Sequence, residues 1–385
     1  MGRFHVLAAL GLVPSALVML SCEGRGEAPP VSTATAGLDA SETHDRPAQG
    51  ASPSADDALP TTDPALACLG AEALITLASG LPYVTVTVGD APTYPGSFLL
   101  DYGTNFSTLD LSKLAPPGPP AAGCDPTLLG QRCSFANLDF FGSWGPVSLR
   151  TAAHGDGTGA SQAGILGTDF TSHVAVSIDY ARSKVHRAFD EASFCTESAF
   201  AAAGFSALST AGFFTNDPSK LRPLADVIAG SSSSFSVANV PTVPLRIAGV
   251  IAHAQLDTGF DDALVPFSVN VNEAFLAAVT ARDPSAVVRM PDKDVSLTTC
   301  AGVAEAVEAY ALAPGAALDF VGEAGQSVKS FPTATLFVKR TPEAAKKCGG
   351  IGTWTVPAAQ VAASFYVSFG LVAFDPFGSR VWVKS

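Results

Sequence analysis

The sequence AQLDTGFDDALVP occupies residues Ala254–Pro266 and decides the fold that we expect for this chain. An apolar run leads there into Asp257, and Gly259 follows two residues later. A similar stretch, SFLLDYGTNFSTL, occupies Ser97–Leu109 and places Asp101 in the same context, again with glycine two residues later. Each glycine is expected to allow a backbone conformation that other residues cannot adopt. We therefore expect two tight turns that form two halves of one site.

The pair of turns resembles the two Asp-Thr/Ser-Gly loops of aspartic peptidases of the pepsin and retropepsin type. In that family a strand precedes each Asp loop, and an apolar segment and a closing strand follow it. The matching segments here are Val84–Val88, Gly164–Phe170 and Val176–Tyr180 in the first half, and Val243–Ile247 and Phe365–Val367 through Ala373–Asp375 in the second. The resemblance covers residues 80–190 and 240–385, and it implies a mostly β, bilobal fold with a cleft between two related lobes.

An internal repeat supports two related halves independently of the family. Superposing Asp179 on Asp375 also superposes five further pairs of residues, namely Phe170 on Tyr366, Val176 on Val372, Ile178 on Phe374, Lys184 on Arg380 and Val185 on Val381. Self-similarity of this kind indicates a duplicated architecture. The second half has a longer segment between its Asp loop and its closing strand, so we expect two β-lobes of unequal length.

The beginning of the chain carries the features of an export signal. Arg3 precedes a short apolar run over residues 6–20, and a small residue follows it, as in a secretory signal peptide. The end of this run, Met19–Cys22, resembles a bacterial lipobox, in which the cysteine is acylated and becomes the first residue of the mature protein. We expect a lipoprotein signal peptide over residues 1–21 and a lipid on Cys22, which would anchor the protein to the bacterial cell envelope; an ordinary cleaved signal is the alternative.

The composition of the chain suggests how the remainder is divided. Residues 22–65 are rich in Ala, Pro, Ser, Thr and acidic side chains, so they cannot bury enough surface to offset the entropy of ordering, and we expect a disordered tether. The rest is long enough for two domains. We place an N-terminal β-lobe at 66–195, an inter-lobe connection with a serine-rich stretch, Ser231–Ser236, at 196–240, and a C-terminal β-lobe at 241–385.

Charge and residue types restrict the possible partners. Hydrophobic residues make up 47% of the chain, which provides ample core material. The formal net charge of −13 argues against a nucleic acid partner, because binding phosphates requires positive charge. The histidines, including His154 and His253, are not spaced as metal ligands, so we expect no metal and no cofactor. Both halves of the site lie in one chain, and we therefore expect a monomer.

The cysteines agree with export. Of the seven cysteines, six remain when Cys22 is set aside, and an even number in an exported protein is typical of disulfides. Sequence alone cannot choose among the 15 pairings that six cysteines allow. The set that we prefer ties the beginning of the first lobe to its end, closes a small loop and crosslinks the second lobe: Cys68–Cys195, Cys124–Cys133 and Cys300–Cys348.

The coarse pattern of the chain is mostly β. Runs of β-branched and apolar residues bounded by Gly and Pro predict strands at Tyr83–Val88, Phe98–Leu100, Val174–Ile178, Val243–Ile247, Leu256, Thr333–Val338 and Val381–Val383. Helical periodicity predicts few helices, over Glu197–Ala203, Glu273–Thr280 and Val303–Ala311.

The resemblance implies a chemistry for the two aspartates. Two carboxylates held close together cannot both ionise, so they share one proton. The ionised member takes a proton from a water, while the protonated member hydrogen-bonds the carbonyl of the scissile peptide. Asp101 and Asp257 would form this catalytic dyad without a metal or a covalent intermediate. The substrate would be a peptide or an unfolded protein.

Two positions depart from the family pattern. The residue after each Asp is Thr or Ser in the family, and its hydroxyl hydrogen-bonds to the opposing loop. Thr258 can make this contact, whereas Tyr102 cannot make it in the same way, because its hydroxyl lies a ring's length further out. The segment Val361–Ala363 aligns with Ile165–Gly167, so that Ala363 replaces a glycine whose added methyl would crowd the packing beneath the Asp257 loop.

The residue that follows each glycine also differs between the halves. Thr104 comes after Gly103 and matches the hydroxyl residue that supports the aspartate in pepsin-type loops. Phe260 stands at the equivalent place after Gly259 and cannot act in this way. The next two acidic residues, Asp261–Asp262, are expected on the surface of the loop rather than in catalysis.

The resemblance further implies a flap, a hairpin that covers the cleft. The best candidate is Ser134–Leu149, with its turn at Gly142–Gly145. The family often places an aromatic hydrogen-bonding side chain on the flap, and Trp144 could take this role. Packing of Trp144 on its own lobe is the alternative.

The sequence leaves three hypotheses. The first is an aspartic endopeptidase that uses Asp101 and Asp257. The second is a catalytically impaired pseudopeptidase of the same fold that binds peptides, because Tyr102 and Ala363 depart from the family. The third is an envelope interaction scaffold. Burying two facing aspartates lowers the stability of a fold, so such a pair is expected mainly where it has a function. This favours the enzyme.

Overall fold

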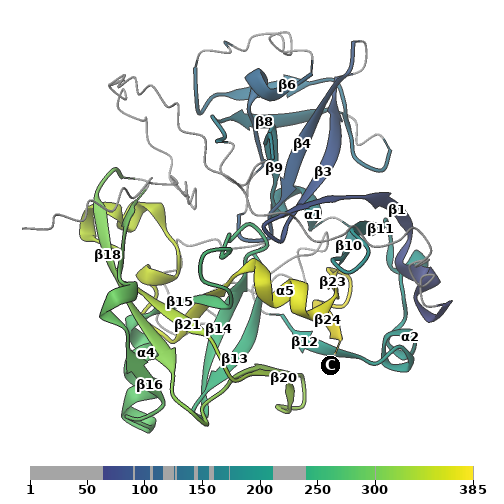
Figure 1. Ribbon diagram of the computed structural model, residues 1–385. Coiled ribbons are helices and arrows are strands. Elements are labelled where there is room, and N and C mark those ends of the chain that lie inside the picture. Colours follow the sequence, from purple (N-terminus) through teal and green to yellow (C-terminus); the bar gives the residue numbers. More distant parts are fainter. Residues whose placement is uncertain are drawn as a thin grey trace, which may run out of the picture.

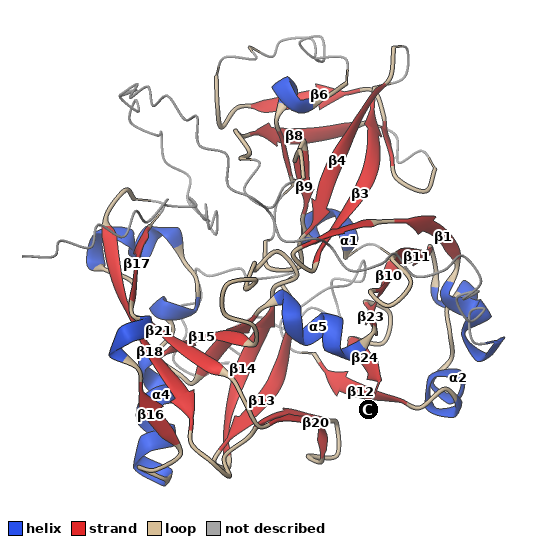
Figure 2. Cartoon of the chain, in the orientation of Figure 1, coloured by secondary structure: helices blue, strands red, loops and turns tan. Residues whose placement is uncertain are grey.

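A computed structural model gives the structure of most of the chain from residue 64 onward, and this part is mostly β (Figure 2). The described residues are 64–89, 92–104, 107–115, 125, 128–142, 146–155, 160–172, 174–210, 240–299 and 301–384. The expected signal peptide, Cys22, nearly all of the tether, and Ser231–Ser236 lie outside these ranges. Within them, none of the helices has the length and apolar character needed to cross a membrane.

The strands form three sheets, two of which each belong to one half of the chain (Figure 1). The first has the order β2 (Thr76–Ala78), β3 (Leu81–Val88), β4 (Tyr94–Leu100), β9 (Gly164–Leu166), β5 (Thr108–Leu109), β8 (Val147–Thr151) and β6 (Arg132–Phe135), with β7 (Leu138–Asp139) paired to β3. The second has the order β16 (Val287–Arg289), β18 (Ala304–Leu312), β21 (Thr335–Lys339), β15 (Ser268–Asn272), β22 (Ala358–Val361), β14 (Val250–Leu256), β13 (Thr242–Ile247), β19 (Leu318–Val321) and β20 (Ser327–Phe331), with β17 (Val295–Thr298) paired to β18.

The third sheet is built from both halves of the chain. Its order is β1 (Ala71–Leu74), β11 (Lys184–Ala188), β10 (Ala175–Asp179), β23 (Leu371–Asp375), β24 (Arg380–Lys384) and β12 (Phe205–Ser209). At its centre, antiparallel β10 and β23 pair Ser177 with Ala373. The internal repeat makes these two residues each other's counterparts, so an approximate two-fold axis passes between them. The repeat that was read from the sequence is therefore also a symmetry of this sheet.

The helices are few and short. They are α1 (Thr168–Thr171), α2 (Glu197–Ala202), α4 (Glu273–Arg282) and α5 (Ala363–Phe369), together with 3-10 helices at Pro64–Leu69, Leu111–Lys113, Glu191–Ser193, Pro291–Lys293, Glu343–Cys348 and Ile351–Thr353. The expected helices that begin at Glu197 and Glu273 are confirmed. α4 begins where the Asn272 side chain accepts a hydrogen bond from the backbone N–H of Phe275 at 2.9 Å, which satisfies a free donor of the first turn.

The helix expected over Val303–Ala311 is wrong, because this segment is strand β18. It pairs with β17 on one side and with β21 on the other. Buried and more exposed residues alternate along most of it, and the buried Glu305 forms an ion pair with Lys339 at 2.5 Å. Alanine and glutamate favour helices, but intrinsic preference amounts to less than about 1 kcal/mol per residue, so pairing within the sheet overrides it.

The interpretation of residues 196–240 as a connection is also incomplete. Its first part contains α2 and β12, and β12 pairs with β24 as an outer strand of the six-stranded sheet. The expected inter-lobe connection is therefore shorter than the sequence suggested, because part of it belongs to the fold.

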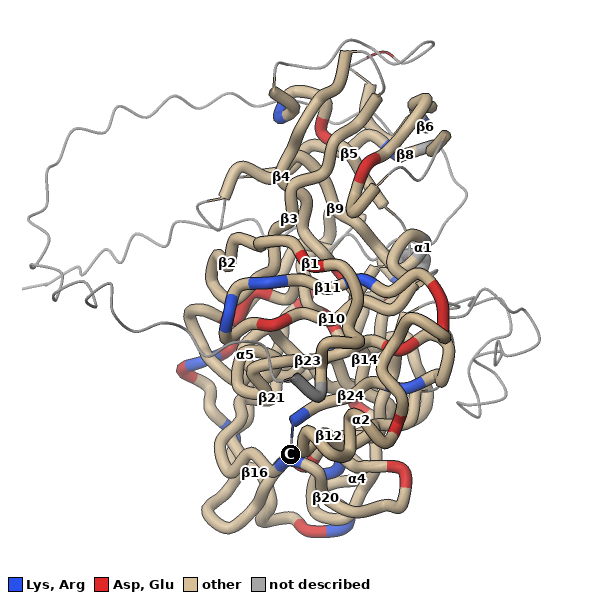
Figure 3. The backbone as a smooth tube through the Cα atoms, turned by 90° about the vertical axis from the view of Figure 1, so that its right-hand side faces the viewer, with Lys and Arg blue, Asp and Glu red and all other residues tan. Residues whose placement is uncertain are grey.

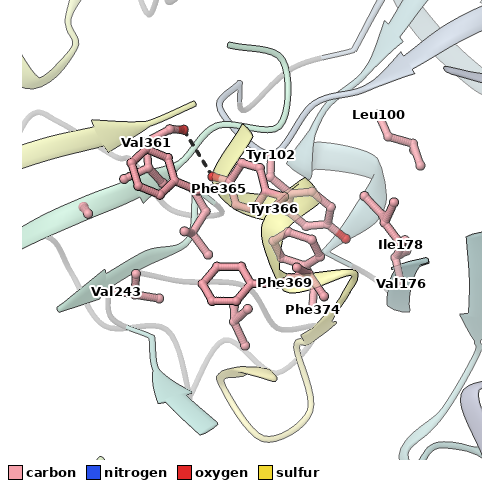
Figure 4. Packing of buried hydrophobic residues seen from close by; sticks show 14 of the residues in the cluster. Leu100, Tyr102, Val176, Ile178, Val243, Val361, Phe365, Tyr366, Phe369 and Phe374 are labelled. Carbon is pink, nitrogen blue, oxygen red and sulfur yellow. Dashed lines mark hydrogen bonds between the residues drawn. The ribbon is translucent and has the colours of Figure 1, made fainter. Parts of the chain in front are cut away.

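One continuous cluster of buried side chains joins the three sheets. It includes Leu100 of the first sheet, Val361 of the second and Ile178 of the third. Figure 4 shows these residues close to the rings of Tyr102 and Phe374. Each fully buried aliphatic side chain contributes about 1.5–3 kcal/mol to folding, so the two halves of the chain are held together mainly by shared apolar contacts.

The expected disulfide between Cys68 and Cys195 is present, with the two sulfurs 2.03 Å apart. Cys133 is also disulfide-bonded, but Cys124 lies outside the described residues, so the Cys124–Cys133 pairing stays a prediction. Cys300 lies outside the described residues, and Cys300–Cys348 likewise stays a prediction.

We expect the double change Cys68→Ser and Cys195→Ser to lower the free energy of unfolding by about 2–5 kcal/mol, because this disulfide closes a long loop in the unfolded chain. Urea denaturation monitored by tryptophan fluorescence measures the effect. An unchanged denaturation midpoint would contradict the stabilising role of this crosslink.

Candidate functional site

Two strands deliver the two aspartates to one place. β4 runs into Asp101, and β14 runs into Asp257. Each strand has a parallel partner that ends beside it, because Leu100 pairs with Leu166 and Leu256 pairs with Val361. We call residues 101–104 the Asp101 loop and residues 257–260 the Asp257 loop.

The chain closes each loop in the same way. The carbonyl of Thr104, the last residue of the Asp101 loop, accepts a hydrogen bond from the N–H of Thr168 at 2.9 Å. The carbonyl of Phe260 accepts the equivalent bond from Ala363 at 3.0 Å. Thr168 and Ala363 are the first residues of α1 and α5, so both loops are fixed by the start of a helix that follows the parallel partner strand.

The two loops lie so close that each glycine faces the opposite aspartate. A β-carbon on Gly103 would overlap the carboxyl group of Asp257, and one on Gly259 would lie 2.7 Å from the carboxyl carbon of Asp101. Neither glycine has a positive φ. The expectation that these glycines supply an unusual backbone conformation is therefore wrong: glycine is required because a side chain would occupy the space of the facing carboxyl group.

The carboxyl groups of Asp101 and Asp257 form a hydrogen-bonded pair where the two loops meet. Asp257 is 8% exposed, and Asp101 is partly exposed to solvent. Burial raises the pKa of both groups, and the charge of Asp101 raises the pKa of Asp257 further. The pair therefore keeps one proton at a pH where isolated aspartates are fully ionised.

Backbone donors hold one oxygen of each carboxyl. Gly103 N–H donates to Oδ1 of Asp101 at 2.7 Å, and Gly259 N–H donates to Oδ1 of Asp257 at 2.9 Å. These two bonds are related by the approximate symmetry of the repeat. They fix the direction in which each carboxyl points, towards the opposite loop.

Thr258 connects the two loops through its hydroxyl group. The Oγ1 atom accepts a hydrogen bond from the N–H of Tyr102 at 3.0 Å and donates one to the carbonyl of Leu100 at 2.7 Å. The residue is fully buried. Thr258 thus makes the inter-loop contact that we expected of it, and it satisfies two backbone groups that water cannot reach.

The side chain of Tyr102 packs against the six-stranded sheet and not against the Asp257 loop. Its ring stacks on Phe374 of β23, with the ring centres 3.6 Å apart and the planes 7° from parallel. Figure 4 shows this ring in the packed layer with Tyr366 and Phe374. Burial raises the pKa of the Tyr102 hydroxyl well above its ordinary value. The first half of the chain therefore has an aromatic contact where the second half has a hydrogen-bonding threonine.

The expected support of Asp101 by Thr104 is absent. The Oγ1 of Thr104 is buried and has no hydrogen-bond partner among the described residues. The backbone of this residue is instead engaged through its carbonyl, by Thr168. The position of Thr104 in the sequence indicates a hydroxyl group near Asp101, but it does not determine whether that hydroxyl points towards the Asp101 carboxyl.

Gln360 is a site residue that the sequence analysis missed. Its Nε2 atom donates to Oδ2 of Asp257 at 2.6 Å, and its Oε1 atom accepts from Nδ2 of Asn270 at 2.8 Å. All three residues are buried. A signal was available in the sequence, because Gln360 is the one polar residue in the apolar run Ala358–Ala363.

The expected alignment of Ala363 with Gly167 is shifted by one residue. Val361 and Leu166 are equivalent by strand pairing, so Ala362 is the counterpart of Gly167. The two have nearly the same backbone, with φ −89° and ψ 174° at Ala362 and φ −87° and ψ −174° at Gly167. This is extended backbone that any residue adopts, so alanine is accommodated there without strain.

Asp262 is buried, contrary to the expectation of a surface position for Asp261–Asp262. Its carboxyl accepts hydrogen bonds from the Ser364 hydroxyl at 2.5 Å and from the N–H of Ser268 at 3.2 Å. These contacts fasten the chain that follows the Asp257 loop to α5. Asp262 therefore has a structural role, and the expectation that it is not catalytic stays a prediction.

The flap prediction is only partly within the described residues, because Trp144 lies outside them. The two ends of Ser134–Leu149 do pair with each other, as β6 with β8, while β7 between them pairs with β3. Beyond β7, the carbonyls of Phe140 and Phe141 accept hydrogen bonds from Arg187 of the six-stranded sheet. The position of Trp144 relative to the two aspartates stays a prediction.

The described residues contain no group of three or more His, Cys, Asp or Glu side chains that could hold a metal ion. In the view of Figure 3, basic and acidic residues are scattered along the described chain. No protein-family model matches this chain, and no curated protein is significantly similar to it. The site must therefore be interpreted from its own geometry.

We expect Thr258→Val to destabilise the fold, at about 1–3 kcal/mol for each backbone group left without a partner. Thr104→Val is the matched control, since it removes an equally buried hydroxyl that has no described partner and should be neutral or slightly stabilising. Chemical denaturation of both variants measures the difference. Equal losses in the two variants would contradict the role assigned to Thr258.

We expect Asp257→Asn to raise the thermal stability of the protein at pH 7 but much less at pH 3. The folded protein binds the shared proton more tightly than the unfolded chain, so this stabilisation is present below the ordinary Asp pKa of about 3.9. This stabilisation is lost as the pH rises through the raised pKa of the pair. Because asparagine cannot ionise, the variant does not suffer this loss, and it is therefore more stable than the natural sequence at pH 7.

Thermal unfolding at the two pH values tests this expectation, with a change in Tm of roughly 2–4 °C for each kcal/mol. The control is Asp261→Asn, which alters a carboxyl of the same segment outside the pair. A gain at pH 7 that is no larger than the gain at pH 3 would refute the expectation for the pair.

Proposed function

We propose that this protein is an aspartic endopeptidase of the pepsin-like type, with Asp101 and Asp257 as its catalytic dyad. The main observation behind the proposal is the close contact of the two loops. The space that a side chain on Gly103 or Gly259 would need is occupied by the carboxyl group of the aspartate in the opposite loop. Two further features support it: the duplicated halves around an approximate two-fold axis, and the buried hydroxyl of Thr258 between the loops. In this proposal the two sheets that each carry one loop form the two lobes.

The geometry suits general acid–base hydrolysis. The ionised carboxyl takes a proton from a water, whose oxygen bonds to the peptide carbonyl carbon while the other carboxyl gives its proton to the carbonyl oxygen. The resulting gem-diol then loses one hydroxyl proton to the second carboxyl. The first carboxyl protonates the amide nitrogen as the C–N bond breaks, so the pair ends with the single proton with which it began.

The burial of the pair also affects the pH range in which the reaction is possible. The reaction requires one ionised and one protonated carboxyl, and raised pKa values extend this half-protonated state to higher pH than in water. We propose that the enzyme acts outside the cytoplasm, attached to the cell envelope through a lipid on Cys22. The disulfide between Cys68 and Cys195 is consistent with an oxidising compartment.

One observation favours the alternative of a peptide-binding protein with impaired catalysis. Gln360 donates to Asp257 at 2.6 Å, and Tyr102 replaces the second hydroxyl that links the loops in the family. Both features make the two halves of the site unequal. The enzyme remains the better proposal, because the carboxyl pair that acid–base hydrolysis needs is intact.

The test is hydrolysis of an unfolded protein by the purified full-length chain between pH 3 and pH 7. We expect activity in the acidic part of this range and inhibition by a statine-type transition-state mimic. Asp101→Asn and Asp257→Asn should each reduce the rate by about 10²–10⁴-fold. Asp261→Asn should retain the activity of the natural sequence.

Two other outcomes would decide against the enzyme. Binding of the mimic without turnover, measured by calorimetry, would identify the peptide-binding alternative. Absence of both binding and turnover, in protein whose cooperative unfolding proves that it is folded, would leave the interaction scaffold.

A further inference from the structure

The two aspartates differ in the donors that reach them. Asp257 accepts hydrogen bonds from the backbone N–H groups of Gly259 and Phe260, and it accepts one from the Gln360 amide at Oδ2. For Asp101 the described residues provide the backbone donors of Gly103 and Gly259, and they provide no side-chain amide. A hydrogen-bond donor stabilises the ionised form of a carboxyl more than the neutral form, so Gln360 favours ionisation of Asp257 over ionisation of Asp101.

Asn270 fixes the direction in which Gln360 acts. An amide side chain can present either its NH₂ group or its oxygen to a neighbour. The Nδ2 of Asn270 donates to the Oε1 of Gln360 at 2.8 Å, and this bond turns the NH₂ end of Gln360 towards Asp257. If the amide were reversed, two donors would face each other on one side and two oxygens on the other.

The difference between the aspartates is built into the sheets. Gln360 on β22 and Asn270 on β15 are direct partners in the antiparallel ladder. The corresponding pair in the first half is Ile165 on β9 and Thr108 on β5. The place that holds an amide beside Asp257 therefore holds an apolar side chain in the half that carries Asp101.

The deeper burial of Asp257 and the charge of Asp101 act in the opposite direction, because both raise the pKa of Asp257, and the Gln360 amide is the donor that offsets them. Tyr366 faces both aspartates from α5, and it stays neutral because burial and the nearby carboxyl charge raise its pKa well above the ordinary value. Its hydroxyl donates to the carbonyl of Val361 at 3.2 Å. Asp262, in the segment that follows the Asp257 loop, is engaged by serine donors instead.

We propose that Gln360, oriented by Asn270, is a positioning residue that keeps Asp257 as the ionised member of the pair. In the first step of the reaction, Asp257 then takes the proton of the attacking water and Asp101 gives its own proton to the peptide carbonyl oxygen. This assignment of roles rests on the proposed peptidase function. The ionisation itself can be measured whether or not the protein hydrolyses peptides.

The test is carbon-13 NMR of the full-length protein labelled at the aspartate carboxyl carbons. The signals of the pair are assigned by their absence in Asp101→Asn and Asp257→Asn. We expect Asp257 to titrate at lower pH than Asp101 in the natural sequence. In Gln360→Met, which keeps the length of the side chain but removes the donor, the midpoint of Asp257 should rise by about 1–2 pH units.

Ile165→Met is the matched control, because it introduces the same side chain at the equivalent place of the first half without removing a donor. It should leave both midpoints unchanged. If Gln360→Met does not fold, Asn270→Val provides the second test, since it removes the group that orients the amide and should raise the Asp257 midpoint by a smaller amount.

Two results would overturn the inference: an Asp101 that ionises first in the natural sequence, or an Asp257 midpoint that does not move in either variant. The pH dependence of peptide hydrolysis, measured on the same samples, separates the two proposals. Complete lack of hydrolysis would reject the peptidase function, while the NMR titration would still decide which aspartate is ionised. In an active enzyme, Gln360→Met should shift the acidic limb of the pH profile in the same direction as the Asp257 midpoint.

Discussion

The lack of a side chain at Gly103 and Gly259 is the constraint on which the site depends. Each Asp loop occupies the space that a β-carbon of the other loop would need. Only when both positions are glycine can the loops approach until the carboxyl groups share a hydrogen bond. Burial of the pair, its retained proton and the bridging position of Thr258 all follow from this approach. The continuous apolar cluster that joins the three sheets holds the loops together against the repulsion of the two charges.

The two halves close their Asp loops with equivalent backbone contacts, but the side chains around the loops differ. The second half contributes the hydroxyl that links the loops, and the first half contributes an aromatic ring that stacks on β23. An amide stands beside Asp257 where an isoleucine stands in the first half. A symmetric pair of carboxyls has no preferred acid or base until a substrate arrives. Unequal surroundings of this kind can set the preference in advance.

Much of the fold could be predicted because it depends on patterns that are local in sequence. The strands that lead to Asp101 and Asp257 are apolar runs with a clear end, and the repeat placed Ser177 and Ala373 in corresponding positions before their pairing was known. β18 could not be predicted in this way, since its Ala and Glu residues favour a helix and only its partners β17 and β21 make it a strand.

The side-chain contacts of the site were harder to predict than its backbone. A residue count places Thr104 next to the Asp101 loop but cannot tell in which direction its hydroxyl points. The role of Gln360 depends on Asn270, a residue far away in sequence that becomes its neighbour only in the folded sheet. The shift between Ala362 and Ala363 arose because two short apolar runs can be aligned in more than one register, and only strand pairing resolves the choice.

The shared six-stranded sheet also has a consequence for how the protein is made. β10 belongs to the first half, yet its neighbour β23 is formed by residues 371–375, so the ribosome must complete nearly all of the second half before the two can pair. Until then the nascent chain exposes an unprotected strand edge, which other chains can join. The interval between synthesis of β10 and of β23 is therefore the period in which this edge is open to association with other chains.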